Sequence, residues 1–113
     1  METGGCHGAA VFNSKHQIIS SFEDIGRHNA VDKCIGQLLE ENQLQNAFLM
    51  LVSGRVSFEI VLKAYRAKIP FLAAVSAPSS LAIDICQQAG ITLLGFCRDD
   101  RATVYTHQNN VSF

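Results

Sequence analysis

The sequence lacks the features that would direct a protein to a membrane, out of the cell or onto a nucleic acid. No apolar run in the 113 residues approaches the ~20 residues that a membrane-spanning helix requires. The opening "METGGCHGAA" does not have the basic and apolar pattern of a signal peptide. The net charge of -1 argues against the broad basic surface that binds a phosphate backbone. We therefore expect a cytoplasmic protein that binds neither membrane nor nucleic acid.

Motifs of several common enzyme classes are also missing. The chain contains neither GxxxxGK[ST] nor GxGxxG, so the usual phosphate-binding and dinucleotide-binding loops are excluded. No nucleophile-elbow sequence supports a Ser-His-Asp triad. A zinc deaminase would need His-x-Glu at one helix start and Pro-Cys-x-x-Cys at the next, and the chain has "HNAVD" and "SGRVS" instead. Hydrolysis at a zinc ion is therefore not expected.

The four cysteines do not form the pattern of a metal site. Cys6, Cys34, Cys86 and Cys97 include no CxxC pair, whereas structural zinc sites usually have closely spaced ligand pairs. Their number would allow two disulfide bonds, but nothing in the sequence suggests secretion. Cys34 and Cys86 lie on apolar faces of predicted helices, where a free cysteine packs as a small hydrophobic side chain. We predict that these two are core residues and expect no metal ligands.

The residues that are present predict one α/β domain. Hydrophobic residues make up 48% and charged residues 17%, a composition typical of globular proteins. Apolar runs predict strands at 8–12, 16–22, 47–52, 71–75 and 91–96, with a further one at 102–107, and the run at 47–52 is expected to be buried on both faces. Helices follow the second, third and fourth of these strands, and this alternation predicts a mainly parallel sheet with helices on both faces.

The apolar spacing in each predicted helix indicates its inner face. Ser79 is a suitable N-cap for the third helix, and Gly90 is a suitable residue to end it. The predicted inner residues are Val31, Cys34, Ile35, Leu38 and Leu39 in the first helix, Phe58, Val61, Leu62 and Tyr65 in the second, and Leu81, Ala82, Ile85, Cys86 and Ala89 in the third.

Polar turns connect the strands to the helices at "IGRHN", "VSGRVS" and "VSAPSS". Parallel α/β sheets bind ligands beyond the carboxyl ends of their strands, and helix N-termini favour anions. Each turn taken alone has the composition of any structural loop. Arginines, however, occur at three of the four turns when "GFCRDDR" is included, and this repetition favours an anion pocket. The candidate donors are Arg27, His28, Asn29, Ser53, Arg55, Ser57, Ser79, Ser80, Arg98 and Arg101.

The segment "TGGCHG" precedes the first strand and carries a second group of candidate residues. Its glycines permit close approach of the backbone to a ligand. Cys6 together with His7 suggests thiolate chemistry or a metal, but Cys6 is equally explained as a partly buried thiol. His7 is a candidate for the pocket or for a structural role.

Five motifs, in order along nearly the whole chain, resemble the C-terminal domain of the FdhD family of formate dehydrogenase accessory proteins. They are "TGGCHGAA", "EDIGRHNAVDKCIG", "SGRVSFEIVLKA", "AVSAPSSLAI" and "GITLLGFCRDDRATVYTH". The resemblance implies a single domain over 1–113, with a cytidine deaminase-like fold, a three-layer α/β/α sandwich. It implies a dimeric sulfurtransferase that takes sulfur from a cysteine desulfurase and delivers it to the bis-molybdopterin guanine dinucleotide cofactor of formate dehydrogenase.

The family's cofactor-binding stretch falls on "FCRDDR", which places Phe96, Cys97, Arg98, Asp99, Asp100 and Arg101 at the cofactor. The helix-start motifs of the resemblance put six residues in the same pocket, namely Arg27, His28, Asn29, Ser53, Arg55 and Ser57. His7 is a further cofactor-binding candidate, and GDP is expected to mimic part of the ligand. The family's sulfur-carrying cysteines lie in a CxxC upstream of "TGG", and this chain has no CxxC. We therefore expect the cofactor-binding part of a sulfurtransferase, with a non-catalytic guanine-nucleotide-binding or dimerisation module as the alternative.

Overall fold

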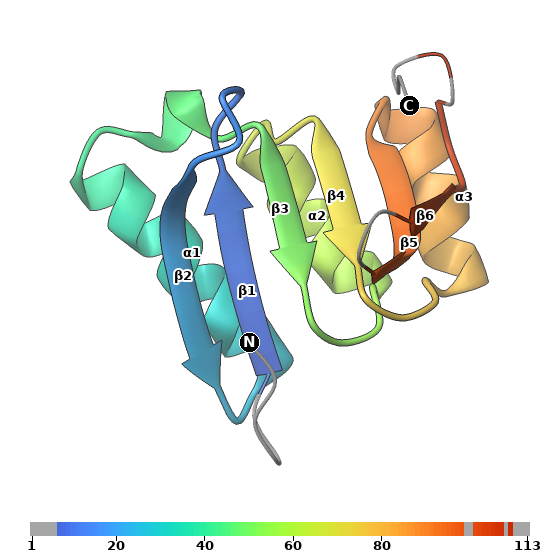
Figure 1. Ribbon diagram of the computed structural model, residues 1–113, viewed down its shortest axis with the longest axis horizontal. Helices are drawn as coiled ribbons and strands as arrows, with labels where there is room; N and C mark the ends of the chain where they lie inside the picture. The colour runs from blue at the N-terminus through green and yellow to red at the C-terminus, as the bar shows by residue number, and fades with distance from the viewer. Residues whose placement is uncertain (1–6, 99–100, 108, 110–113) are drawn as a thin grey trace.

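The part of the chain that the structure describes folds into one mixed sheet with three α-helices, which confirms the α/β class (Figure 1). The computed structural model describes residues 7–98, 101–107 and 109. The strands are β1 (His7–Phe12), β2 (Ile18–Asp24), β3 (Leu49–Val52), β4 (Phe71–Ala74), β5 (Thr92–Arg98) and β6 (Arg101–Val104). The helices are α1 (Arg27–Glu40), α2 (Phe58–Arg66) and α3 (Ser80–Ala89), with a short 3-10 helix η1 (Leu44–Asn46) before β3.

The strand order is β2-β1-β3-β4-β5-β6, and the sheet is parallel only at its centre. The pairs β3-β4 and β4-β5 are parallel, whereas β1 is antiparallel to both β2 and β3, and β6 is antiparallel to β5. The prediction of a mainly parallel sheet is therefore matched only in part. The strands of each outer pair, β1-β2 and β5-β6, are separated by only a few residues, which are too few for the crossover that parallel pairing needs.

All three α-helices lie behind the sheet in Figure 1, on the same face. The connections from β2 to β3, from β3 to β4 and from β4 to β5 all step across the sheet in one direction. Right-handed crossovers that step in one direction place their helices on one side. The described residues therefore form two layers, and the expected second layer of helices does not occur among them.

The core lies between the sheet and this helical layer. Alternate residues of the central strands point into it, among them Val11, Met50, Val52 and Leu72, all with 1% exposure or less. Leu49 and Leu51 alternate with them and are only half-buried, so β3 is not fully buried on both faces as expected. The predicted core role of Cys34 and Cys86 is confirmed, since both are 0% exposed.

The two predicted end signals of α3 are confirmed, whereas the predicted inner face of α2 is matched only in part. Ser79 caps α3 by accepting a hydrogen bond from the amide of Ala82 at 3.1 Å, and Gly90 ends the helix in the left-handed conformation at φ 78. In α2, by contrast, Phe58 and Tyr65 are exposed, and the buried residues are Ile60, Val61 and Ala64. A short helix with apolar residues on more than one side leaves the phase of the inner face ambiguous.

Two further predicted inner residues, Leu39 of α1 and Leu81 of α3, are 58% and 55% exposed. Each stands at the edge of an apolar stripe whose centre is buried, so the buried face of each helix is one position narrower than predicted. Among the described residues, no helix combines the length and apolar character that crossing a membrane requires.

Candidate functional site

One edge of the sheet gathers the segments that the sequence proposed for a pocket. Strands β2, β3, β4 and β5 run in the same direction, so their carboxyl ends meet there, at the lower edge of Figure 1. Strands β1 and β6 run the opposite way and begin at this edge, where His7 pairs with Asp24 and Arg101 pairs with Arg98. Helices α1, α2 and α3 all begin beside it (Figure 1). We call it the carboxyl edge.

The predicted pocket residues lie along the carboxyl edge on several different elements. Arg27 and His28 form the first backbone positions of α1, and Arg98 ends β5. Arg55 and Arg101 are exposed, and His7 and Cys97 are partly buried. Phe96 is 46% exposed and has a left-handed backbone at φ 53. Cys6, Asp99 and Asp100 lie outside the described residues.

Ser53 ties the start of β1 to the turn before α2. The amide of Gly8 donates to Ser53 Oγ at 2.8 Å, and the amide of Ser53 donates to the carbonyl oxygen of Gly8 at 3.0 Å. The pairing of β1 with β3 therefore extends past Val52, directly to the edge. Because the hydroxyl is used here as an acceptor, its proton remains able to donate. The contact depends on β1 and β3 being neighbours, which the sequence does not reveal.

Ser57 presents a buried hydroxyl at the start of α2. It is the N-cap residue, and its carbonyl accepts the first helical hydrogen bond from Val61 at 3.2 Å. Its side-chain oxygen makes no capping bond and finds no partner within the described part of the chain. Buried polar atoms nearly always have a partner, so an unpaired hydroxyl at a helix start is a natural contact point for a ligand.

The end of β5 is held against the turn between β4 and α3. The amide of Phe96 donates to the carbonyl oxygen of Ser76 at 3.3 Å. Gly95 makes this approach possible, because a Cβ there would lie 2.8 Å from the Tyr105 ring, 3.1 Å from Pro78 and 3.3 Å from the same carbonyl oxygen. Ser79 uses its hydroxyl to cap α3, which gives that side chain a structural role.

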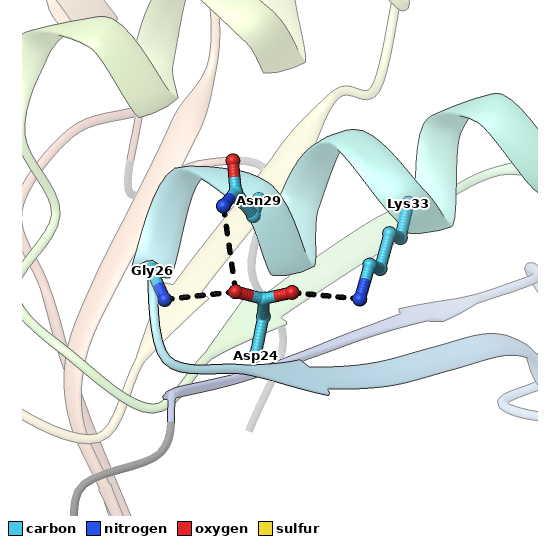
Figure 2. Close-up of polar contacts among 4 residues, drawn as sticks. All are labelled: Asp24, Gly26, Asn29 and Lys33. Atoms are coloured by element: carbon cyan, nitrogen blue, oxygen red, sulfur yellow. Dashed lines mark hydrogen bonds and ion pairs between the residues drawn. The ribbon is translucent and has the colours of Figure 1, made fainter.

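Asp24 organises the turn between β2 and α1, and sequence reasoning did not identify it (Figure 2). Its carboxylate accepts hydrogen bonds from the amide of Gly26 at 2.9 Å, from Lys33 Nζ at 2.6 Å and from Asn29 Nδ2 at 3.4 Å. The hydrogen bond from Lys33, followed by that from the Gly26 amide, lowers the pKa of Asp24 from 3.8 to about 2. Asn29, predicted as a pocket residue, directs its amide toward this carboxylate (Figure 2). An Asp two residues before a glycine is a turn signal that could have revealed this role.

The three described cysteines are held in the thiol form. Burial raises the pKa of Cys34 and Cys97, and it raises that of Cys86 to about 12. Cys34 also donates from Sγ to the carbonyl oxygen of Ala9 at 3.4 Å, deep in the core. Among the described residues, no three His, Cys, Asp or Glu side chains are grouped so that they could hold a metal ion.

A surface hollow of about 360 Å³ lies at the opposite edge of the sheet, away from the predicted residues. It is formed by the turn between β1 and β2 and by the segment before β3, and its lining includes Asn13, Lys15, Gln17 and Gln45. Asn13 and Gln17 hydrogen-bond each other at 2.9 Å, so their polar groups serve the turn itself. We place the candidate site at the carboxyl edge instead, because three helices begin there and helix N-termini favour anions.

A family model, curated relatives and a solved structure all indicate the same family for this chain. The family model described as FdhD/NarQ family matches residues 1–112. The chain is similar to the protein named "Sulfur carrier protein FdhD" from Sulfurisphaera tokodaii, with 48% identity over 110 residues. It is 46% identical over 110 residues to the protein of the same name from Saccharolobus solfataricus. A crystal structure titled as a putative formate dehydrogenase accessory protein from Desulfotalea psychrophila superposes with a TM-score of 0.89 at 32% identity.

These matches cover nearly all of this chain but less than half of the relatives. The two sulfur carrier proteins are matched over 96% of this chain and 43% of their own length. The crystal structure is matched over 98% of this chain and 49% of its own. More than half of each of these relatives therefore lies outside the part that aligns with this chain.

Proposed function

The chain belongs to the FdhD/NarQ family, and from this premise we propose that it is the cofactor-binding part of a sulfur carrier serving formate dehydrogenase. The sulfur would come from a cysteine desulfurase. Its acceptor would be the bis-molybdopterin guanine dinucleotide cofactor, which is the substrate of the transfer. The formate dehydrogenase catalytic subunit would then receive the sulfurated cofactor, and the protein would act as a homodimer.

The observation that carries this proposal is the convergence of three helix starts on the carboxyl edge (Figure 1). A bis-guanine dinucleotide carries two pyrophosphates, and helix N-termini favour such anions through their amide groups and dipoles. The unpartnered hydroxyl of Ser57 supports the fit, because a phosphate oxygen would accept its proton. Arg55 and Arg101 are exposed at the same edge and would supply charge-assisted hydrogen bonds.

An aromatic side chain beside these donors would suit the guanine base. Phe96 exposes 46% of its surface, so its ring is accessible to a ligand at this edge. Its left-handed backbone lies within β5, where the pairing with β6 is irregular between Gly95 and Arg98. Stacking of a base on such a ring contributes ~1–3 kcal/mol in nucleic-acid-binding proteins. We infer that Phe96 supports the base while the helix starts hold the phosphates.

The three cysteines that the structure describes support a role in binding rather than in carrying sulfur. Sulfur transfer requires a thiolate, which forms where nearby cations lower the pKa of the thiol. Burial has the opposite effect on Cys34, Cys86 and Cys97. The same observation favours the second candidate function, a guanine-nucleotide-binding or dimerisation module without transfer chemistry.

Calorimetric titration with GDP tests the proposal. The chain should bind GDP, and it should bind GMP more weakly because GMP lacks the second phosphate. Arg101→Ala should weaken GDP binding by about 1–3 kcal/mol, the usual contribution of a hydrogen bond to a charged group. Arg66→Ala is the matched control, because Arg66 is an exposed arginine at the far end of α2. Absence of GDP binding, or equal losses in the two variants, would contradict the proposal.

Transfer itself needs a separate measurement. A cysteine desulfurase supplied with radiolabelled cysteine should load sulfur onto a full-length family protein, and little or none onto this chain. Stable labelling of Cys34, Cys86 or Cys97 in the folded chain would show that the division between binding and carrying is incorrect.

A further inference from the structure

We propose that Asp24 is a positioning residue of the carboxyl edge, whose carboxylate fixes the turn that presents the first residues of α1 to an anionic ligand. This inference rests on the proposed function, since the ligand is the guanine nucleotide argued above. Asp24 would not touch the ligand. It would act through Gly26 and through the start of α1 (Figure 2).

The turn between β2 and α1 is short, and neither of its two residues anchors it through a side chain. Strand β2 ends at Asp24 and α1 begins at Arg27, so only Ile25 and Gly26 connect them. Ile25 exposes 80% of its surface and therefore does not anchor the turn in the core. Gly26 is the N-cap residue and has no side chain with which to cap the helix. Asp24 accepts from its amide, which closes the turn from the strand side.

The same carboxylate fixes α1 relative to β2. Asn29 and Lys33 both donate to it, and residues four apart lie on the same face of a helix. One side chain at the end of a strand thus contacts three points along the start of the helix (Figure 2). Asn29 consequently lies over Gly26, where a Cβ would be 3.0 Å from its Nδ2 atom.

The negative charge of Asp24 allows two roles to be distinguished, because they predict opposite changes in ligand affinity when Asp24 is removed. A carboxylate near an anion site repels the ligand, and if Asp24 acted only through charge, its removal would strengthen binding. Lys33 pairs with it at 2.6 Å and offsets the charge locally. If Asp24 acts by holding the turn, its removal weakens binding, because the ligand must then order the start of α1 itself.

Three variants of the whole chain separate these effects in a GDP titration. Asp24→Ala should weaken binding about three- to tenfold, the range expected for ordering one additional side chain. Asp24→Asn keeps an acceptor for the Gly26 amide and should recover most of the affinity. Asp32→Ala is the control, because Asp32 is also on α1 and pairs with Lys63 at 2.7 Å but does not contact the turn. Equal or tighter binding by Asp24→Ala would overturn the inference, as would an equal loss in Asp32→Ala.

Hydrogen exchange provides a readout that does not depend on the ligand. In Asp24→Ala the amides at the start of α1 should exchange faster, while those of β3 and β4 should keep their protection. If the variant does not fold, the same comparison is made with Lys33→Met, which removes one of the three contacts. If the unchanged chain does not bind GDP, the proposed function fails and exchange alone decides the role of Asp24. Unchanged exchange at the start of α1 would then refute it.

Discussion

Replacing Gly95 with alanine should test whether the end of β5 is packed as closely as the structure indicates. The added Cβ would lie 2.8 Å from the Tyr105 ring, closer than non-bonded carbon atoms approach each other. The side chain of Pro78 and the carbonyl oxygen of Ser76 are also within 3.3 Å of it. That carbonyl accepts the hydrogen bond from Phe96, so relief of the contact must disturb the edge itself.

The expected cost follows from two opposing effects. Overpacking of this kind costs about 1–3 kcal/mol. Replacing glycine also restricts the unfolded chain, which returns about 0.4–1 kcal/mol. We therefore expect Gly95→Ala to lower the free energy of unfolding by roughly 1–2 kcal/mol. Gly36→Ala is the matched control, because Gly36 is inside α1 and its Cβ would meet nothing within 4 Å. It should raise the free energy of unfolding by about 0.5–1 kcal/mol.

Urea unfolding followed by far-ultraviolet circular dichroism measures both variants, since the chain contains no tryptophan to report by fluorescence. Opposite shifts of the midpoint at an unchanged m-value are expected. If Gly95→Ala were as stable as the unchanged chain, the close approach of β5 to the turn before α3 would be incorrect. If Gly36→Ala were also destabilising, the substitution would not be reporting on packing.

Three other properties can be checked with the same preparations. Ser79→Ala should destabilise the chain by about 1 kcal/mol through loss of the α3 cap, whereas exposed Ser80→Ala should change it by less than about 0.5 kcal/mol in urea unfolding. Asp24 has a pKa lowered from 3.8 to about 2, so its stabilising contribution is complete above the higher value and is lost as the pH falls toward the lower. In an acid titration followed by circular dichroism, Asp24→Asn should lack this part of the loss. Cys86, whose pKa is raised to about 12, should resist alkylation at pH ~8 in the folded chain and react when the chain is unfolded, as peptide mass spectrometry would show.

The order of elements could be predicted from the sequence because its signals are local. Apolar runs between polar turns identify the strands, and Ser79 and Gly90 mark the ends of α3 through interactions with residues nearby in the chain. The single layer of helices could not be predicted in the same way. It depends on the order of the strands in the sheet, and alternation along the chain does not specify which strands are neighbours.

The residues of the carboxyl edge also divide into those that local sequence indicates and those that depend on contacts between distant parts of the chain. The arginines at the turns are visible in the sequence, and so is the pairing of an aspartate with a glycine two residues later. The bond between Ser53 and Gly8 joins residues 45 apart in the chain, and no local pattern predicts it. The unpaired hydroxyl of Ser57 is likewise a property of packing, because a serine before a helix usually caps it.

The antiparallel strands, which the prediction of a mainly parallel sheet did not include, have a consequence for the site. In a sheet whose strands were all parallel, every strand would begin at the edge opposite the carboxyl ends. His7, the first residue of β1, would then lie a full strand length from the helix starts. Because β1 is antiparallel to β2 and β3, His7 begins at the carboxyl edge instead. The position of His7 among the predicted pocket residues thus depends on an antiparallel strand that the sequence did not indicate, whereas the residues that follow β2, β3 and β5 reach the same edge because those strands run in one direction.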